Sequence, residues 1–468
     1  MELQSPWTTQ IKKERDVMPL DADTETDICI VGGGISGIIT AYNILKYTNH
    51  RVVLLDAREI AHGATGHNAG QLVAELERPI FSIVEDFGLI KTMKAIEDIE
   101  SSWVTIEQII QDLDIPINYS TFMGYNLYST KRQVHEKLKD LVIIEDAGVN
   151  IRKMLIAKEF AEQLEIGDEY KEVVEYIDQD DMLSLSETNN LDYIAAFPLK
   201  KGCLNSALFT EKIAHMLLKK YANRFSIHEN TFVKEIDINV NDVVVRTDLG
   251  NNVTSQKLIL CTNGFENFTI RSNKDQNLNF NFHKHIKGLV GYMFAKTESL
   301  NKNPGAFAYF DKYFEDNMEE AAEDVDRNRD VAYLDNYTYT TRRHYDLENE
   351  DTKNLFCIGG IATVLEDTTS YNKQHIYDEN AKQYYLDFMK NNINQEPVEE
   401  GHREFIWHGL MGYTADGLRL VGFDNREEKL MYNLGCNGIG ILPAIWGGKR
   451  IADLLNGDTT ESLFDPRI

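Results

Sequence analysis

The sequence is poor in cysteine, and its few cysteines are not arranged as a metal or redox motif. Its 468 residues include five, an odd number, and none belongs to a Cys-x-x-Cys pair. Disulfide frameworks pair an even number of cysteines, and zinc or redox motifs place two of them close together. The cysteines are therefore predicted to be reduced thiols of a cytoplasmic protein: Cys29, Cys203, Cys261, Cys357 and Cys436.

Basic residues are scarce relative to acidic ones. The chain has 48 Lys and Arg against 75 Asp and Glu, a formal net charge of −27. A surface that collects nucleic-acid phosphates or anionic lipid needs the opposite sign of charge. We therefore expect no nucleic-acid partner, and a role in tRNA modification is disfavoured for the same reason.

Long apolar segments are almost absent. The N-terminus lacks the apolar core and small-residue cleavage site of a secretory signal. One uncharged run, residues 28–45, has the 18-residue length of a membrane span but contains Gly32, Gly33, Gly34 and Gly37. This glycine pattern has a better explanation in a water-soluble fold, so we expect no membrane span.

Those glycines lie between a predicted strand and a predicted helix. "DICIVGG" is typical of a buried strand, "ISGIITAYNILKYT" of a helix and "RVVLLDA" of a second strand. Gly32, Gly34 and Gly37 form Gly-x-Gly-x-x-Gly, which brings a pyrophosphate to the N-terminus of the helix. Asp56, 19 residues after Gly37, is placed to accept ribose hydroxyls and would repel a 2′-phosphate, which leaves FAD or NAD.

The rest of the chain suggests a second domain. Residues 76–200 have mostly helical patterning, and the later segments "FSIHEN", "FVKEIDI", "VVVRT" and "QKLILCTNGF" are strand-like. "HIKGLVGYMFAK" and "VAYLDNYTYTTRR" predict a further sheet. Residues 311–330 form an acid-rich insertion, typical of a solvated helix or loop.

Several segments together carry a family resemblance. "GGGISGIITAYNILK", "VVLLDAREIAHGATGHNAGQ", "GCLNSALFTEKIAHMLL", "LILCTNGF", "WHGLMGYTADGLRLVG" and "GCNGIGILPAIWGGKRIADLL" occur in that order. They resemble the FAD-dependent amine and amino-acid oxidoreductases related to D-amino-acid oxidase, glycine oxidase and sarcosine oxidase, with gamma-glutamylputrescine-oxidase-like members nearest.

The resemblance implies an α/β fold of two interleaved domains. A Rossmann-like FAD-binding domain of the glutathione-reductase type would comprise residues 24–100, 203–275 and 405–468. An α+β substrate domain with a large mixed sheet would comprise residues 101–202 and 276–404.

The resemblance also implies cofactor contacts along the glycine loop "GATGHNAG", at the strand "LILCTNGF" and at "CNGIGILPA", where a helix N-terminus would meet the flavin. The predicted FAD-binding residues are Gly32, Gly34, Ile35, Ser36, Gly37, Asp56, Ala57, Arg58, Gly63, Ala64, Thr65, His67, Asn68, Ala69, Gly70, Val233, Thr262, Asn263, Gly264, Asn437, Gly438, Ile439 and Gly440.

His67 is the one imidazole in the glycine loop, and two roles are open for it. In dimethylglycine and sarcosine dehydrogenases a histidine at a similar position carries the flavin covalently, and a neutral imidazole is a competent nucleophile. The alternative is a hydrogen bond to a phosphate or ribityl oxygen. A cysteinyl flavin is not supported, because Met411 and Gly412 stand beside the relevant motif.

The implied reaction is oxidation of the C–N bond of an amine or amino acid to an imine by hydride transfer to flavin N5, with oxygen or another acceptor completing turnover. Arg342 is predicted as the carboxylate-binding residue, with Arg343 as the alternative, and Tyr339, Trp407 and Met411 as residues beside the flavin. Arg419 stands where the family often has proline.

Two other functions remain open at this point: hydroxy-acid or polyol oxidation on the same fold, and a non-catalytic FAD-binding partner subunit that docks through the acidic insertion. His283 and His285 lack a third ligand, so we predict no metal site. The residues indicate no particular oligomeric state.

Overall fold

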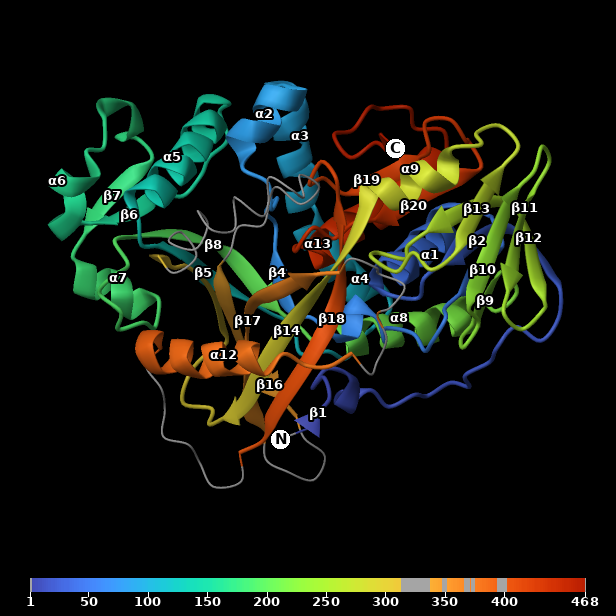
Figure 1. The fold of residues 1–468 in the computed structure, drawn as a ribbon, viewed down its shortest axis with the longest axis horizontal. Coiled ribbons are helices and arrows are strands. Elements are labelled where there is room, and N and C mark those ends of the chain that lie inside the picture. Colours follow the sequence, from blue (N-terminus) through green and yellow to red (C-terminus); the bar gives the residue numbers. More distant parts are fainter. Residues whose placement is uncertain are drawn as a thin grey trace.

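Two β-sheets organise the molecule. The computed structural model describes residues 2–312, 337–346, 352–365, 371, 375–393 and 402–467. Within these residues one sheet has nine strands and the other eleven. The two sheets lie side by side, and the chain passes between them several times (Figure 1).

The nine-stranded sheet contains the predicted strand–helix–strand unit. Its central strands β12, β2 and β3 are parallel, and their Val, Ile and Leu side chains are buried on both faces, as parallel sheets require. The strands are β2 (Thr24–Val31), β3 (Val52–Leu55), β9 (Phe225–His228), β10 (Val233–Ile238), β11 (Val243–Thr247), β12 (Asn252–Leu260), β13 (Thr269–Ser272), β19 (Leu420–Phe423) and β20 (Leu430–Leu434).

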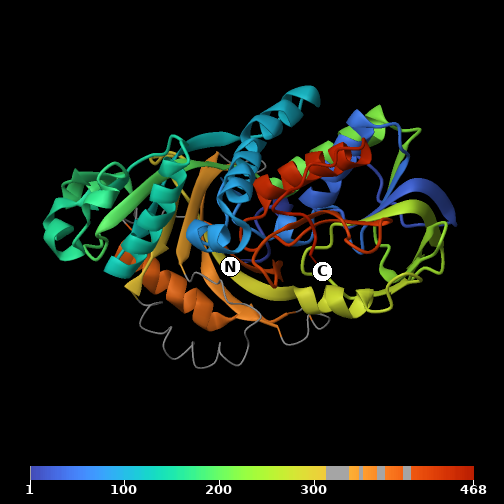
Figure 2. The same cartoon turned by 90° about the horizontal axis from the view of Figure 1, so that it is seen from above.

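Three long helices pack together against this sheet. They are α1 (Ile35–Tyr47), α8 (Ser206–Lys220) and α13 (Ile441–Leu455), and Figure 2 shows them grouped on one side of the molecule. A side chain at Gly448 would place its Cβ 2.8 Å from Cγ2 of Ile39, so the missing side chain lets α13 approach α1 closely. The apolar run 28–45 is therefore β2, a turn and α1. Within the described ranges, no helix combines the length and apolar character that crossing a bilayer demands.

The eleven-stranded sheet is mixed, which confirms the predicted large mixed sheet. β14 pairs antiparallel with β17 and β18, whereas β15 pairs parallel with β5. Its strands are β1 (Glu2–Leu3), β4 (Gln71–Val73), β5 (Ser120–Tyr128), β6 (Met154–Ala157), β7 (Val174–Ile177), β8 (Ala195–Cys203), β14 (Ile286–Glu298), β15 (Gly305–Phe310), β16 (Thr338–Tyr345), β17 (Lys353–Val364) and β18 (Glu404–Thr414).

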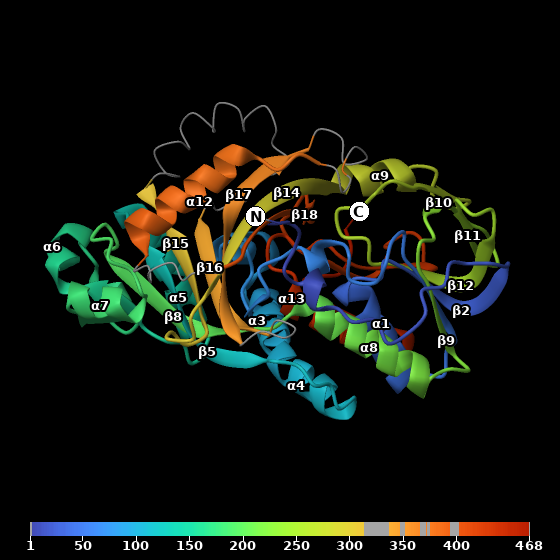
Figure 3. The same ribbon diagram turned by 90° about the horizontal axis from the view of Figure 1, so that it is seen from below.

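Helices cover the outer surfaces of this sheet. Helix α12 packs Tyr385 and Phe388 onto β14 and β17 and lies across them in Figure 3. Helix α5 packs on the strands at the other end, through Val134 and Leu138. The remaining bounds are α2 (Ile80–Phe87), α3 (Leu89–Glu100), α4 (Ser102–Asp112), α5 (Lys131–Asp146), α6 (Ala161–Leu164), α7 (Gln179–Leu185), α9 (Leu278–His285) and α12 (Glu379–Asn392).

Some sequence expectations are corrected by these elements. Residues 76–200 were expected to be mostly helical but contain β5, β6, β7 and β8. Residues 405–414 were assigned to the FAD-binding domain, yet as part of β18 they pair with β14 in the other sheet. His285, the first residue of the predicted strand segment "HIKGLVGYMFAK", ends α9 instead, and the strand begins at Ile286. The remaining domain boundaries stay a prediction, and residues 313–330 of the acidic insertion lie outside the described residues.

Candidate functional site

The glycine turn after β2 is shaped for close approach of a ligand. Gly32 has φ +108°, a backbone conformation that residues with a Cβ rarely adopt, and a Cβ there would lie 2.5 Å from the carbonyl oxygen of Cys261. A Cβ at Gly37 would lie 1.9 Å from the oxygen of Gly32, so α1 packs directly on the turn. Gly34, Ile35 and Ser36 at the start of α1 line a cavity, as a phosphate site at a helix N-terminus requires.

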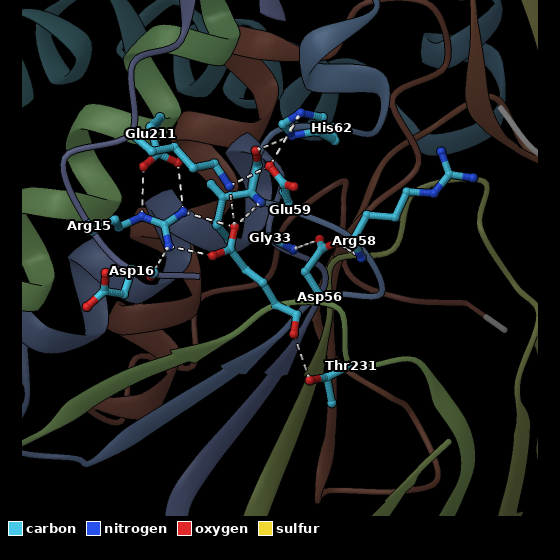
Figure 4. Close-up of polar contacts among 12 residues, drawn as sticks. Arg15, Asp16, Gly33, Asp56, Arg58, Glu59, His62, Glu211 and Thr231 are labelled. Atoms are coloured by element: carbon cyan, nitrogen blue, oxygen red, sulfur yellow. Dashed lines mark hydrogen bonds and ion pairs between the residues drawn. The ribbon is translucent and has the colours of Figure 1, made fainter. Parts of the chain in front are cut away.

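Asp56 follows β3 and fixes the geometry beside this turn. Its carboxylate accepts hydrogen bonds from the N–H groups of Gly33, at 2.6 Å, and Arg58, at 2.8 Å (Figure 4). Burial raises the pKa of Asp56. The side chain lines the cavity together with Ala57 and Arg58, at the position predicted for a ribose contact.

An N-terminal arm braces the entry to the glycine loop, which the sequence did not reveal. Buried Glu229 accepts a hydrogen bond from the Ile60 N–H at 2.7 Å. Arg15, from the arm, pairs with Glu229 at 2.5 Å and with Glu211 at 2.7 Å (Figure 4). The arm therefore holds the segment that leads into residues 63–70.

The glycine loop itself is pinned on both sides. The Thr65 hydroxyl accepts a hydrogen bond from the Ile35 N–H at 2.9 Å, which ties the loop to the start of α1. The Thr65 carbonyl accepts one from the Ser206 hydroxyl at 2.7 Å. A Cβ at Gly66 would lie 2.4 Å from the oxygen of Ala61. The predicted loop contacts all line the cavity: Gly63, Ala64, Thr65, His67, Asn68, Ala69 and Gly70.

The imidazole of His67 is neutral and oriented. Its Nδ1 lies 2.9 Å from the carbonyl oxygen of Gly63, and a carbonyl can only accept, so Nδ1 carries the proton. Burial lowers the pKa of His67 to about 4, which keeps the ring neutral at pH 7. Nε2 then has a free lone pair that can accept a hydrogen bond or act as a nucleophile, but it cannot donate to a phosphate.

A second glycine turn closes the opposite end of the site. Gly438, Ile439 and Gly440 line the cavity immediately before α13. Asn437 supports the turn from behind, where its side-chain oxygen accepts a hydrogen bond from the Thr414 N–H at 2.8 Å. Of the other predicted contacts, Val233, Thr262 and Asn263 line the cavity, whereas Gly37, Gly264 and Asn437 do not.

The eleven-stranded sheet supplies a chamber beside the glycine loop. Tyr339 and Met411, which were predicted to lie beside the flavin, both line it. Cross-strand pairing places Met293, Gly359, Tyr339, Ala308 and Asn126 in one row across β14, β17, β16, β15 and β5. All of these except Gly359 line the cavity, so a rigid row of side chains forms its wall.

The structure does not bring Arg342 or Trp407 to this chamber. Successive side chains on a strand point to opposite faces, and Arg342 lies on the other face of β16 from Tyr339. There it is buried between Glu187, at 2.7 Å, and Glu298. Trp407 packs edge-on against Trp7 in the core, with 6.5 Å between ring centroids. Neither lines the cavity.

The alternative arginine is also engaged elsewhere. Arg343 stacks over the ring of Trp7 at 4.4 Å and donates to Gln10 at 2.7 Å. Arg419, at the proline position of the family, is buried and donates to Asn433 at 2.9 Å and to Ser36. His283 contacts Glu266 at 3.0 Å, and no three His, Cys, Asp or Glu side chains gather as a metal would require in the part of the chain that the structure describes.

Several residues that line the cavity were not predicted from the sequence. Glu75 and Glu77 follow β4 and are two residues apart. In an extended segment this spacing predicts that both side chains lie on the same face. Lys201 gave no signal, because "KKG" at a strand end is typical of a solvated turn. All three line the chamber.

One continuous cavity of about 850 Å³ joins the glycine turn, the glycine loop, the second turn and the chamber. The Thr262 hydroxyl lines it, buried and without a hydrogen-bond partner in the described residues, as a polar atom awaiting a ligand would be. Fold and site together define a dinucleotide-binding protein whose nucleotide cradle opens onto a second, sheet-walled chamber.

The chain matches the family "FAD dependent oxidoreductase" over residues 27–454. It therefore belongs to this family, and its cofactor is FAD, which the two glycine turns and the loop between them fit.

Individual relatives are more distant. The chain is 38% identical to gamma-glutamylputrescine oxidoreductase of Escherichia coli over 74 residues, 15% of this chain and 17% of that enzyme, so it spans less than a fifth of that curated relative. It resembles the structure of glycine oxidase from Geobacillus kaustophilus (TM-score 0.62, 16% identity, 94% and 97% of the two chains). It also resembles L-proline dehydrogenase from P. horikoshii (TM-score 0.63, 16% identity, 95% and 97%). At these identities the structural likeness bears on the fold.

Proposed function

We propose that this protein oxidises the C–N bond of an amine or amino acid to an imine, and that oxygen or another acceptor removes the electrons. The observation that carries the proposal is the single cavity, which continues from the nucleotide cradle into a chamber walled by Tyr339, Met293 and Met411. Two similar proteins are named for gamma-glutamylputrescine and glycine, and both compounds carry an amino group, which supports the same class of substrate.

The FAD would be held by the start of α1, Asp56, the loop of residues 63–70 and the turn of residues 437–440. Bound there, FAD supplies a two-electron acceptor for hydride from the substrate carbon. The turn at the start of α13 places a helix N-terminus at the cavity, where its dipole favours negative charge.

The chamber residues would position the substrate and exclude water. Hydride leaves a carbon only when the adjacent nitrogen lone pair is free, so the substrate amine must be neutral. Where Met293, Met411 and Tyr339 form the chamber wall, away from the carboxylates of Glu75 and Glu77, desolvation disfavours a charged ammonium and so promotes the neutral form. The Tyr339 hydroxyl contacts the Met293 sulfur at 3.2 Å, which fixes two of these side chains relative to each other.

The test is a visible spectrum of the FAD-loaded protein under anaerobic conditions. We expect bleaching of the flavin by members of a panel of amines and amino acids, and no bleaching by hydroxy acids or polyols. Bleaching by hydroxy acids or polyols alone would replace the proposal with the hydroxyl-oxidising alternative. Bleaching by dithionite alone would indicate a non-catalytic FAD-binding subunit.

Acid precipitation of the same sample separates the two roles of His67. We expect a yellow supernatant, because Nδ1 is committed to Gly63 and Nε2 is suited to accept a hydrogen bond from a ribityl hydroxyl. A yellow pellet that becomes colourless in His67→Ala would instead show covalent attachment.

We also propose that the protein acts in a reducing compartment such as the cytoplasm. All five cysteines are free thiols, and four of them are buried.

A further inference from the structure

Arg419 is a buried arginine whose partners among the described residues are all neutral. It lies immediately before β19, is 5% exposed and lines the cavity. It donates to the side-chain and main-chain oxygens of Asn433, at 2.9 Å and 3.2 Å, and to the hydroxyl of Ser36. Nε and Nη2 make these bonds, so within the described residues the two N–H donors of Nη1 are left for another acceptor.

The guanidinium of Arg419 is held in one orientation. Asn433, on β20, donates its side-chain amide to the Thr40 hydroxyl at 3.0 Å and to the Ala444 carbonyl at 3.2 Å, so its side-chain oxygen is the atom that faces the guanidinium. A Cβ at Gly447 would lie 2.3 Å from that oxygen, which shows how tightly α13 packs against Asn433. A donor fixed in this way loses little conformational freedom when it binds a ligand.

The buried charge of Arg419 costs stability. Its electrostatic neighbours are the thiols of Cys261 and Cys436, and no carboxylate of the described residues pairs with it. Burial lowers the pKa of Arg419 to about 10, yet the guanidinium stays charged at pH 7. An anion at Nη1 offsets this cost, because a hydrogen bond between charged groups is strong where water is excluded.

The position of Arg419 selects the anion. Ser36 is the second residue of α1, the helix whose N-terminus is shaped for phosphate. The carbonyl of Cys261 packs against the first glycine turn, and Cys436 directly precedes the second one. Arg419 therefore lies between the turn expected at the adenosine half of FAD and the turn expected at its flavin half, and the pyrophosphate is the group that joins these halves.

We infer that Arg419 binds the pyrophosphate of FAD through Nη1 and makes the protein select the dinucleotide over riboflavin. The glycine turn and the dipole of α1 favour phosphate but supply a partial positive charge, to which Arg419 adds a full one. The guanidinium fork also matches the geometry of phosphate oxygens. The family often has proline at this position, and proline has no side-chain donor, so the contact belongs to this chain rather than to the shared fold.

Ligands that differ in their phosphate groups test this contact. FAD and riboflavin are titrated by flavin fluorescence, and ADP and adenosine by calorimetry, with wild type, Arg419→Gln and Arg419→Lys. We expect Arg419→Gln to weaken FAD and ADP roughly 10- to 100-fold, the usual worth of a charged hydrogen bond, and to leave riboflavin and adenosine within about threefold. Arg419→Lys keeps the charge but loses the planar fork, so its affinities should lie between those of wild type and Arg419→Gln.

The matched control is Arg224→Gln, at the other end of α1. Arg224 donates to the carbonyls of Leu45 and Thr48 and does not line the cavity, so its loss should leave the affinity ratio of FAD to riboflavin unchanged. Equal losses for FAD and riboflavin in Arg419→Gln, or no loss for either, would overturn the inference. A wild type that binds riboflavin as tightly as FAD would overturn it as well.

A second measurement does not require the weaker ligands. Each protein is unfolded by heat with and without the same excess of FAD, and the increases in melting temperature are compared. We expect a smaller increase in Arg419→Gln than in wild type, because a lower affinity reduces the stabilisation by FAD, whereas Arg224→Gln should retain the full increase. An equal increase in Arg419→Gln would refute the inference. Neither measurement involves turnover, so both decide the role of Arg419 even if the proposed C–N oxidation fails.

Discussion

Two histidines, His67 and His408, lie where β18 passes the glycine loop. A Cβ at Gly409 would lie 3.0 Å from Cβ of His67, and the adjacent residue is His408, whose Nδ1 lies 2.8 Å from the Tyr371 hydroxyl. Burial lowers the pKa of both rings to about 4. Each is therefore neutral in the folded protein at pH values where the unfolded chain already takes up a proton.

This difference predicts acid sensitivity. Stability from a histidine whose pKa is lowered on folding is complete above about pH 6.5 and is lost as the pH falls toward 4. We expect the free energy of unfolding to fall by roughly 1–3 kcal/mol across this window for each ring. Urea unfolding at pH 7, 5.5 and 4.5 measures it. The slope should flatten in His67→Gln and His408→Gln; an unchanged slope in both would refute the assignment.

At the scale of single residues, most of the residues predicted for the cofactor site line the cavity, whereas Arg342 and Trp407 of the predicted substrate site do not. Glycines are informative because a side chain would not fit: a Cβ at Gly37 or Gly32 would lie only 1.9 Å or 2.5 Å from a backbone oxygen. Whether Arg342 lines the cavity depends on the face of β16 that it occupies. Whether Lys201 does depends on the space that Gly124 leaves for its side chain. Neither could be read without knowing the pairing of strands far apart in sequence.

At the scale of elements, the loop of residues 63–70 offers a matched pair of substitutions. A Cβ at Gly66 would lie 2.4 Å from the Ala61 carbonyl oxygen, whereas one at Gly63 would meet only the Phe265 ring, at 3.5 Å. Gly66→Ala must therefore displace backbone, and Gly63→Ala makes an ordinary contact. We expect Gly66→Ala to lose about 1–3 kcal/mol of stability and at least about tenfold in FAD affinity, while Gly63→Ala loses less.

Fluorescence titration with FAD and urea unfolding would measure the two effects. Equal behaviour of the two variants would mean that the loop tolerates displacement and that its geometry does not set FAD affinity.

Elements with a strong pattern of their own were predictable, and elements without one were not. The β2–α1–β3 unit follows from one glycine motif between two apolar runs. In contrast, β5 pairs with β15, more than 170 residues later, and β8 pairs with β5 and β4. Residues 120–128 and 195–203 carry no strong strand pattern of their own, so only the assembled sheet makes them strands.

At the scale of the whole molecule, the cavity draws its walls from both sheets. Gly32 and Asp56 come from the nine-stranded sheet and its turns, whereas Met293, Tyr339 and Asn126 come from the eleven-stranded one. A ligand that fills the cavity therefore stabilises the two parts together, by about 2.7 kcal/mol at one hundred times its dissociation constant.

We accordingly expect the melting temperature to rise with FAD concentration and to rise less with either half of the cofactor. ADP carries the groups predicted for the cradle at Gly32, Ser36 and Asp56 but lacks the flavin predicted to meet the turn at Gly438, and riboflavin has the opposite limitation. Differential scanning calorimetry with FAD, ADP and riboflavin at equal concentrations separates these contributions. If ADP alone reproduced the full shift, only the nucleotide half of the site would contribute to stability, and residues 63–70 and 437–440 would not hold the flavin. A larger shift with FAD than with both halves supplied together would show that the covalent link between them joins the two sheets through one ligand.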